Sequence, residues 1–410
     1  MIADNDYGGS VDFNSGSSAG QAMFINQGGT VSGAYGGITS FTSSGTAGNC
    51  TVINNGASVS GAFGGVTAFV ENATAGNGTF ITNGGTASGA GRGYVYFDVG
   101  GTTGDGVFIT NGVTALGAGG GAVRFFGDSS ADNATFVANG GTDEGDGAAI
   151  YFFHDSIGAS ARFELLDDGR LDISGHNAPG VDVGSVEGSG FVYLGANELK
   201  VGTNNRSTAF VGVIQDGGLL GGSGGWLTKI GTGTFTLSGA NTYTGGTTVS
   251  EGVLLAHSKQ GSATGTGDVT VNGGLLGGNG IVGGRVSIDA GGFLSPGRDG
   301  PGTLRIKRAL RFNSNGTCLC ELQTAMGKAD AVVARNVKIK PGASASIDDI
   351  DTIALPPGTV FTIINNTGAR PISGTFSNLA DGSIFVLGAN VYQANYEGGD
   401  GNDLTLTVVP

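Results

Sequence analysis

Three short clusters of acidic residues are the side chains best suited to chemistry in this sequence. Paired carboxylates can cleave a glycosidic bond as acid and base, or as acid and nucleophile. A polysaccharide lyase or glycosidase would also need a basic residue or a second acid on a neighbouring segment. Because Asp143 and Glu144 follow Gly140 at a turn, where carboxylates are usually solvated, we expect surface residues and no catalytic residue. The clusters are Asp143-Glu144-Asp146, Asp167-Asp168 and Asp348-Asp349-Asp351.

Metal and cofactor chemistry also lack the residue spacing that they require. The histidines His154, His176 and His257 lack the spacing of a metal centre. Cys318 and Cys320 lie two apart, so on a strand both would point to one face, as small inward-facing apolar side chains. Residues 398–406, GGDGNDLTL, fit one copy of the calcium-binding nonapeptide of β-rolls, but such an ion lies between adjacent copies. We therefore expect no metal and no cofactor.

The elements that would position any functional side chain follow from a repeat of 28 residues. Four columns of residues keep this interval in one register, so one structural unit is stacked at least five times. Two columns are aromatic, one is Gly, and one is Gln followed by Asn. The columns are Phe41, Phe69, Phe97, Phe125 and Phe153; Phe24, Val52, Phe80, Phe108 and Phe136; Gly33, Gly61, Gly89, Gly117 and Gly145; and Gln27, Asn55, Asn83, Asn111 and Asn139.

Each unit has the composition of short strands joined by turns. Apolar runs such as 79–81 and 94–97 are too short for helices, and Gly, Asn, Ser and Thr separate them. A unit of this size cannot bury its apolar face alone, so it must stack on its neighbours. We therefore predict an all-β, right-handed β-solenoid (β-helix) with 28-residue coils in the N-terminal half, about 4.8 Å apart, and coils nearer 20 residues later. The Phe columns should form inward aromatic stacks, the Asn column an amide ladder, and the Gly column a corner.

The composition is typical of an ordered extracellular β protein. Gly accounts for 84 of 410 residues without a three-residue period, Pro for only 8, and charged residues for 13%. The formal net charge of −14 argues against nucleic acid and anionic membranes as partners. Residues 1–7 have neither the basic nor the apolar region of an export signal. The chain is therefore expected to be a fragment of a larger secreted protein, or to have its export signal outside this segment.

One stretch is similar to a known family. Residues 227–249, LTKIGTGTFTLSGANTYTGGTTV, resemble the autotransporter-associated β-strand repeat, or passenger-associated transport repeat, of bacterial type V secreted proteins. Residues 268–305 and 361–404 resemble, more weakly, the coils and closing segment of the same passengers. The resemblance implies a passenger that is secreted or on the cell surface. It would be associated with the outer membrane only through a membrane barrel outside this chain.

Composition and periodicity divide the chain into five segments. They are an N-terminal capping segment (1–20), 28-residue solenoid repeats (21–183), irregular coils (184–226), the autotransporter-associated repeat with Gly-rich coils (227–305) and a C-terminal passenger-type β segment (306–410).

The expected function is structural and adhesive, without catalysis. A rod-like passenger would hold a surface away from the cell and make weak multivalent contacts with host-surface or glycan ligands through its polar ladders. Two alternatives stay open, a carbohydrate-active β-helix enzyme and an extracellular matrix or surface-layer element without a specific ligand. Unpaired strand edges at the ends of the stack also predict self-association.

Overall fold

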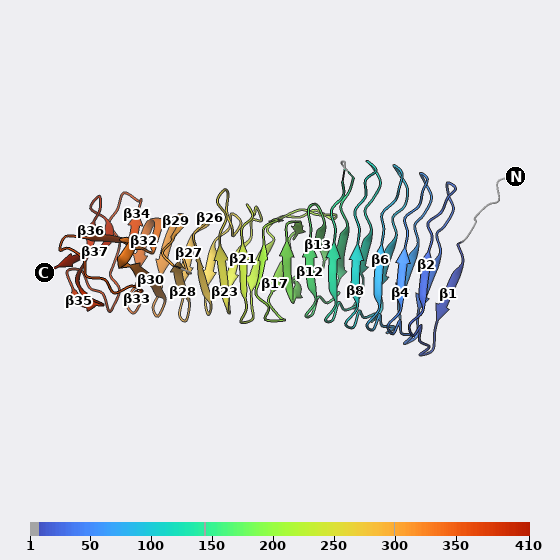
Figure 1. Ribbon diagram of the computed structural model, residues 1–410, viewed down its shortest axis with the longest axis horizontal. Coiled ribbons are helices and arrows are strands. Elements are labelled where there is room, and N and C mark those ends of the chain that lie inside the picture. The colour runs from blue at the N-terminus through green and yellow to red at the C-terminus, as the bar shows by residue number, and fades with distance from the viewer. Residues whose placement is uncertain (1–7, 143–144, 299) are drawn as a thin grey trace. The chain divides into compact units, whose positions relative to one another are not determined.

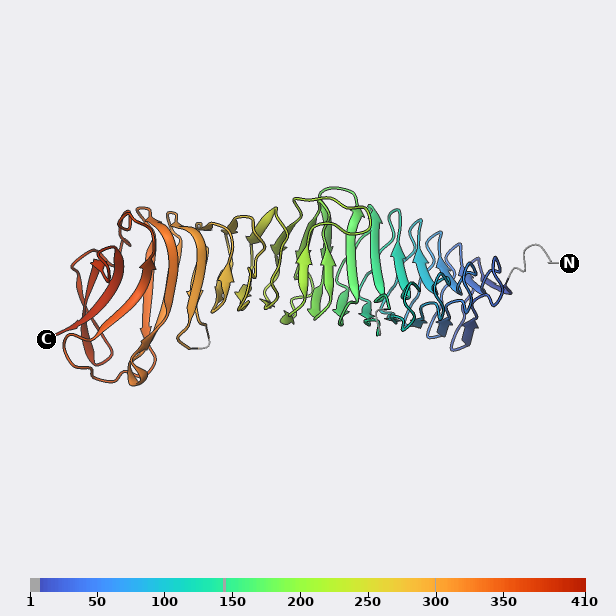
Figure 2. The same cartoon turned by 90° about the horizontal axis from the view of Figure 1, so that it is seen from above.

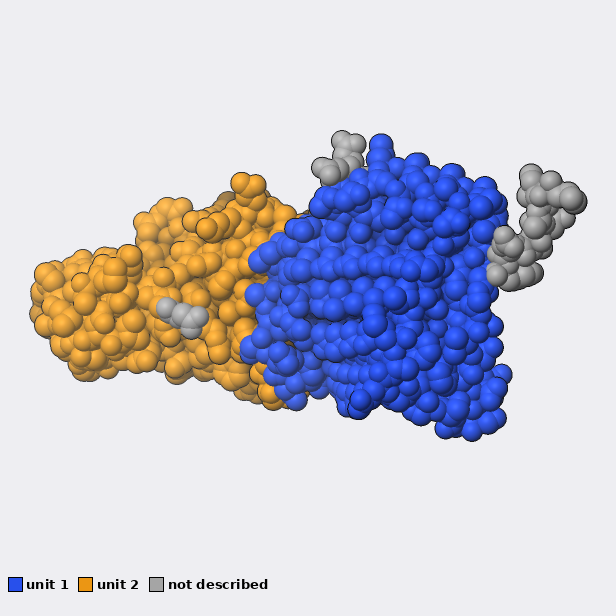
Figure 3. All heavy atoms as spheres, turned by 45° about the vertical axis from the view of Figure 1, so that its right-hand side comes forward, with its two compact units in different colours: residues 1–226 blue, residues 227–410 orange. Residues whose placement is uncertain are grey.

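Parallel strands follow one another at a regular interval in the computed structural model, which describes residues 8–142, 145–298 and 300–410. The chain divides into two compact units, Met1–Trp226 and Leu227–Pro410, and the division falls where the Gly-rich repeat begins (Figure 3). The described residues contain one short 3-10 helix, η1 (Thr324–Met326), and otherwise strands and turns. None of their helices has the length and hydrophobicity needed to cross a bilayer.

The first unit consists of short strands, most of them four residues long. They are β1 (Ser10–Phe13), β2 (Met23–Asn26), β3 (Ile38–Phe41), β4 (Thr51–Asn54), β5 (Val66–Phe69), β6 (Thr79–Thr82), β7 (Tyr94–Phe97), β8 (Val107–Thr110), β9 (Ala122–Phe125), β10 (Thr135–Ala138), β11 (Ala149–His154), β12 (Arg162–Leu165), β13 (Arg170–His176), β14 (Gly180–Val183), β15 (Ser185–Gly188), β16 (Phe191–Tyr193), β17 (Glu198–Val201), β18 (Thr208–Phe210) and β19 (Val213–Gln215).

Each coil of this unit adds one strand to each of two parallel sheets, so strands such as β2, β4, β6 and β8 stand side by side (Figure 1). One sheet has the order β1-β3-β5-β7-β9-β11-β13-β16-β19, and the other β2-β4-β6-β8-β10-β12-β15-β18. Later coils add a third sheet with β14 and β17. Between the two sheets, single-residue bridges join a Ser/Thr column: Ser18, Thr46, Thr74, Thr102 and Ser130. The β-solenoid is therefore confirmed, while its right-handed sense stays a prediction.

Two columns of phenylalanine fill the core of these coils. In the first column, the ring centroids of Phe41, Phe69 and Phe97 are 4.8 Å apart and those of Phe97 and Phe125 are 5.0 Å apart, with nearly parallel planes. The second column stacks at similar distances from Phe80 to Phe163 and meets the first edge to face. Strand spacing of about 4.8 Å is also a stacking distance for aromatic rings. The predicted inward stacks are confirmed, and they extend back to Phe13, within the segment predicted to be a cap.

The last member of the first column is Phe152, so the prediction of Phe153 was wrong. Phe152 pairs with Phe125 and stacks on it at 4.6 Å, whereas Phe153 stacks on Phe126 on the outside. The corner that follows Asn139 is one residue shorter than the corner that follows Asn111, so this coil has 27 residues. Later coils are shorter still, since Ala149 pairs with Arg170. The strict interval therefore ends before residue 183.

The predicted amide ladder is confirmed. Asn55 Nδ2 donates to Gln27 Oε1 at 3.0 Å, and the same bond recurs at 2.8, 2.8 and 2.7 Å up to Asn139. The predicted Gly corner is confirmed for four positions, where φ lies between 70° and 83°. Gly145 has no such positive φ, because it lies in the shortened corner. The four positions are Gly33, Gly61, Gly89 and Gly117.

The second unit has shorter coils at first and longer strands near its end (Figure 2). Its strands are β20 (Trp226–Lys229), β21 (Thr234–Leu237), β22 (Gly246–Val249), β23 (Val253–Ala256), β24 (Val269–Val271), β25 (Leu275–Gly278), β26 (Ile281–Val282), β27 (Val286–Ile288), β28 (Phe293–Pro296), β29 (Thr303–Phe312), β30 (Thr317–Gln323), β31 (Lys328–Ala329), β32 (Ala331–Ile339), β33 (Ser344–Asp349), β34 (Val360–Asn366), β35 (Ile384–Leu387), β36 (Asn390–Gly398) and β37 (Asp403–Val409).

Two parallel runs of strands build this unit, β21-β23-β25-β28-β30 and β22-β24-β27-β29-β32-β34. The paired strands begin at Thr234, Val253 and Leu275, in steps close to the predicted 20 residues. The antiparallel strands β37, β36 and β35 then follow β34. Cys318 and Cys320 are both buried on one face of β30 with their Sγ atoms 3.5 Å apart, as the sequence predicted.

Candidate functional site

The outer face of the sheet that contains β7, β9, β11, β13 and β16 is where the coils of the first unit differ from one another. The inward positions of these strands stay apolar, from Val and Phe in β7 to Leu and Ile in β13, but the outward positions change in character from coil to coil. In register, one outward column reads Ile38, Val66, Tyr94, Ala122, Ala149, Arg170, Phe191 and Val213. The next reads Ser40, Ala68, Tyr96, Arg124, Tyr151, Asp172, Tyr193 and Gln215. Coil stacking requires only the inward columns, so this variation is free to serve binding.

Aromatic rings and arginines alternate along this surface, which we call the aromatic face. The Arg124 guanidinium carbon lies 5.6 Å from the centroid of Tyr94 and 5.8 Å from that of Tyr151, in cation–π contact with both. Arg170 Nη2 donates to the hydroxyl of Tyr151 at 3.4 Å. The contacts therefore continue from coil to coil. The face comprises Tyr94, Tyr96, Arg124, Tyr151, Phe153, Arg170, Phe191 and Tyr193.

A groove of about 470 Å³, the Arg92 groove, lies at one end of the aromatic face. Tyr35 and Phe63 stack at 4.7 Å along one side and are 42% and 49% exposed. The pKa of Tyr96 is raised, mainly because the phenol is partly buried, so this group is neutral at physiological pH. The lining residues are Tyr35, Gly36, Ile38, Phe63, Gly64, Val66, Gly91, Arg92, Tyr94, Tyr96 and Arg124, and no carboxylate is among them.

A second hollow of about 270 Å³ lies further along the same face. It is lined by Tyr151, Arg170, Asp172, Tyr193, Gly218 and Leu219. The carboxylate of Asp172 accepts hydrogen bonds from the backbone N–H groups of Ser174 at 2.9 Å and Leu219 at 2.7 Å. These bonds hold the loop around Gly218 against the aromatic face. Asp172 thus positions the loop that forms one side of this hollow.

The acidic clusters singled out in the sequence hold turns. Asp143 and Glu144 lie outside the described residues, and Asp146 is exposed. Asp168 accepts the backbone N–H of Gly141 at 2.6 Å. Asp349 accepts the hydroxyl of Thr324 at 2.8 Å and two backbone N–H groups, and Asp351 accepts the N–H of Ala325. Asp168, Asp349 and Asp351 thus accept hydrogen bonds from nearby backbone N–H or hydroxyl groups.

His154, His176 and the nonapeptide-like segment make local contacts as well, whereas His257 Nε2 is buried without a hydrogen-bond partner among the described residues. His154 accepts the N–H of Gly127 at 3.4 Å, and the ring of His176 contacts the carbonyls of Asn177 and Ser156. The segment 398–406 contains the turn between β36 and β37, where Asp403 accepts the N–H of Asn366 at 2.8 Å. In the described part of the chain, no group of three His, Cys, Asp or Glu side chains is arranged to hold a metal ion.

Asp330 is a buried carboxylate that predicts a pH dependence of stability in the second unit. It accepts backbone N–H groups of Gly302 at 2.9 Å and Glu321 at 3.0 Å, and burial raises its pKa to about 7 from an ordinary value of 3.8. The folded chain therefore holds a proton between these values that the unfolded chain has lost. Protonated Asp330 therefore favours the folded state. The stabilisation is complete below the pKa of Asp330 in the unfolded chain, and it is lost as the pH rises through its pKa in the folded chain.

The expected result is a lower urea midpoint for the second unit at pH 8 than at pH 5, measured by circular dichroism on the full chain. Asp330→Asn should be free of this part of the pH dependence. The exposed Asp348→Asn is the matched control and should retain it. An Asp330→Asn variant that loses as much stability between the two values as the wild type would show that another group titrates.

Sequence reasoning missed the aromatic face. Run 94–97 was interpreted as an apolar strand, although its outward residues are the tyrosines Tyr94 and Tyr96. The available signal was the contrast between constant inward columns and variable outward ones rich in Tyr and Arg. That signal needs the exact register, which changes at the 27-residue coil.

Residues that resembled a transport repeat form a self-contained network. Phe235 and Leu237 on β21 are buried, and the hydroxyl of the buried Tyr243 lies 2.6 Å from that of Thr247. Lys229 Nζ donates to the carbonyls of Ile230 and Gly231 at 2.5 and 2.6 Å, and burial lowers its pKa to about 8. The polar residues of the motif thus satisfy one another and the backbone at the corner of a coil.

Comparison with known proteins finds a family match at this same segment. The family model described as passenger-associated-transport-repeat matches residues 227–256. Among curated proteins none is similar in sequence to this chain. Among solved structures, the chain is similar to the crystal structure of the Haemophilus influenzae Hap adhesin at 12% identity and a TM-score of 0.22, over 98% of this chain and 64% of that chain. The chain thus spans less than two thirds of the length of that adhesin's chain.

The matched segment confirms the resemblance seen in the sequence. Such repeats belong to secreted or cell-surface passengers, which is the localisation that the family match implies for this chain. This chain is therefore one that contains a passenger-associated-transport-repeat.

Proposed function

We propose that the chain is a non-catalytic adhesive passenger at the outer surface of a bacterial cell, and that its aromatic face binds glycans. The observation that carries the proposal is the ladder of outward Tyr, Phe and Arg side chains from β7 to β16, in which Tyr151 is buried and the other members are partly exposed. Aromatic faces pack against the C–H groups of sugar rings, while phenol and guanidinium groups donate hydrogen bonds to sugar oxygens. Coil after coil offers such a contact, so weak contacts add along a glycan chain.

The carboxylates around the face favour binding over hydrolysis. Among the described residues that line its two hollows, the carboxylate is Asp172, and its oxygens accept backbone N–H groups. A glycosidase needs two carboxyl groups on either side of the scissile bond. This supports a binding role for the face.

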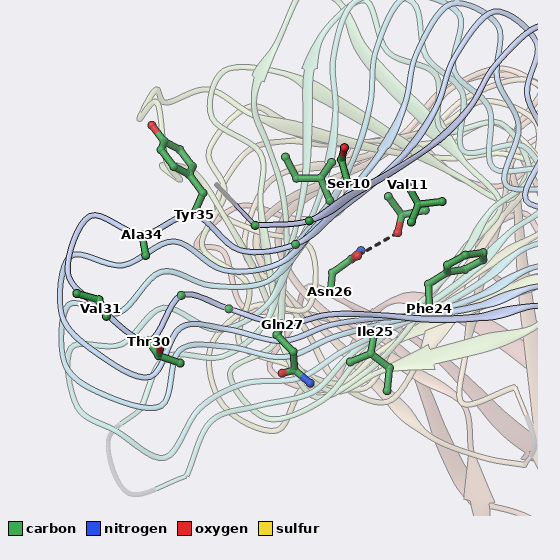
Figure 4. Close-up of a pocket in the computed structure, with 17 residues that line it drawn as sticks. Ser10, Val11, Phe24, Ile25, Asn26, Gln27, Thr30, Val31, Ala34 and Tyr35 are labelled. Atoms are coloured by element: carbon green, nitrogen blue, oxygen red, sulfur yellow. Dashed lines mark hydrogen bonds between the residues drawn. The ribbon is translucent and has the colours of Figure 1, made fainter. Parts of the chain in front are cut away.

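A surface-layer element without a specific ligand is the second candidate, favoured by the end of the first unit that contains β1 and β2. There Val11 and Ile25 are 43% and 51% exposed beside a hollow of about 490 Å³, where Asn26 accepts a hydrogen bond from the Thr39 hydroxyl (Figure 4). Each of these two strands has one neighbouring strand among the described residues. A second copy of the chain could pair with this edge, and self-association is therefore part of the proposal.

The test is retention of the purified chain on immobilised glycans. The double variant Tyr96→Ala and Tyr193→Ala should lose about tenfold or more in affinity, since aromatic anchors dominate such contacts. Ile81→Ala, an outward position of the other sheet, is the matched control and should bind like the wild type. Sedimentation of the same samples separates the candidates: a chain that self-associates but binds no glycan is a surface-layer element, and unchanged binding by the double variant would exclude the aromatic face.

A further inference from the structure

We propose that the Arg92 groove selects a carboxylated saccharide chain, with a sugar ring against the aromatic side chains and its carboxylate on the guanidinium groups of Arg92 and Arg124. This inference rests on the proposed glycan-binding function and adds the chemical class of the ligand. Four observations support it.

The first observation is that these two guanidinium groups have no anionic partner among the described residues. Other basic side chains of the same unit are paired: Arg162 contacts Glu164 and Glu187, and Lys200 contacts Asp182 and Glu198. For Arg92 and Arg124, the described residues supply no ion pair, and Arg92 Nη1 and Arg124 Nε are buried without a hydrogen-bond acceptor. A carboxylate that meets the accessible nitrogens of each guanidinium would supply the anionic partner that the described residues lack.

The second observation is that glycines shape the groove around the arginines. The guanidinium of Arg92 packs on Gly119, where any Cβ would collide with it. Gly91 occupies the position in the next coil that is equivalent to Tyr35 and Phe63. Because glycine has no side chain, the column of rings ends there and leaves space beside Arg92. The groove therefore has an aromatic wall and a cationic end.

The third observation is how few positive charges this unit has and where they lie. Residues 1–226 contain 6 Lys and Arg against 20 Asp and Glu, so their formal net charge accounts for the whole −14 of the chain. Three of the six basic residues, Arg92, Arg124 and Arg170, line the two hollows of the aromatic face. Surface solubility does not require this placement, whereas recognition of an anion does.

The fourth observation is the spacing of the arginines along the face. Arg124 on β9 and Arg170 on β13 are separated by one intervening strand, β11, and by two residues along the strands, and thus by roughly 12 Å. The buried ring of Tyr151, which is only 4% exposed, lies between the two arginines and holds them in place. This is about the length of a disaccharide, so an extended chain with regularly repeated carboxylates can meet the two arginines in turn.

The test uses titration calorimetry of the full chain with tetragalacturonate, a hyaluronan tetrasaccharide and the methyl ester of each. At least one acid should bind about tenfold or more tightly than its own ester, because the ester cannot form charge-assisted bonds, and added salt should weaken this preference. Arg92→Gln and Arg124→Gln should each reduce the acid-to-ester ratio towards one. Arg206→Gln, an exposed arginine in the loop between β17 and β18, is the matched control and should keep it. Melting curves show whether each variant is folded.

The outcomes separate this inference from the proposed function. Equal binding of acid and ester that Tyr96→Ala abolishes would overturn the charge preference and leave glycan binding in place. No binding of any of the four saccharides, in a chain that also ignores immobilised neutral glycans, would overturn both. A poly-glutamate peptide that binds more tightly than the saccharides and loses affinity in Arg124→Gln would identify an acidic peptide as the ligand and make the saccharide assignment wrong.

Discussion

Replacing Phe97 with Asp is expected to abolish most of the stability of the first unit. The ring is fully buried between Phe69 and Phe125, at 4.8 and 5.0 Å, and meets Phe108 edge to face at 5.6 Å. Loss of a large buried aromatic costs about 3–5 kcal/mol, and an unpaired buried carboxylate adds several more. Because folded domains are stable by only about 5–15 kcal/mol, this one change removes a large share.

Urea unfolding followed by circular dichroism measures the effect. The control is Val107→Asp, an outward position in the same array, which should cost about 1 kcal/mol or less. A melting curve for Phe97→Asp that matches the wild type would mean that the column faces solvent and that the register is wrong.

Gly56→Ala is expected to have the second largest effect. A Cβ at this position would overlap the backbone carbonyl of Gly84 in the next coil, and φ at Gly56 is not in the left-handed region, so the collision alone decides the outcome. Overlap with a backbone atom can be relieved only by opening the stack, which costs about 1–3 kcal/mol or more. Gly28 and Gly112 make the same close approach in their coils.

The same unfolding measurement tests this prediction with Gly9→Ala as its control. A Cβ added at Gly9 would have no atom of the described residues within 4 Å, and φ there is not positive, so the substitution should be neutral or slightly stabilising. Equal unfolding free energies for the two variants would show that the corner at Gly56 has room to open.

Much of the solenoid followed from residues that repeat with one interval. Stacked coils place identical residues roughly one strand spacing apart, so the amides of a column such as Asn55, Asn83 and Asn111 can bond to one another along the stack. The inward Phe columns are equally self-consistent, because each ring packs on its own repeat. In both cases the residues that repeat in the sequence are the residues that contact one another in the folded stack.

A further glycine column can be seen in the sequence, but the sequence does not show why glycine is needed there. Its members are Gly28, Gly56, Gly84, Gly112 and Gly140. Glycine can mark a positive φ, as at Gly33, or a close approach of another backbone, as at Gly56. Only the distance between neighbouring coils distinguishes the two.

By itself, the sequence determined the solenoid, the contents of its core, its amide ladder and the presence of a transport repeat, because these depend on residues that are equivalent in successive coils. The tertiary structure decided the rest. It moved the core position from Phe153 to Phe152, brought Arg124 between Tyr94 and Tyr151, and left Arg92 beside the space at Gly91. Such contacts join residues that are not equivalent, and a shift of one residue in a strand exchanges its inner and outer faces.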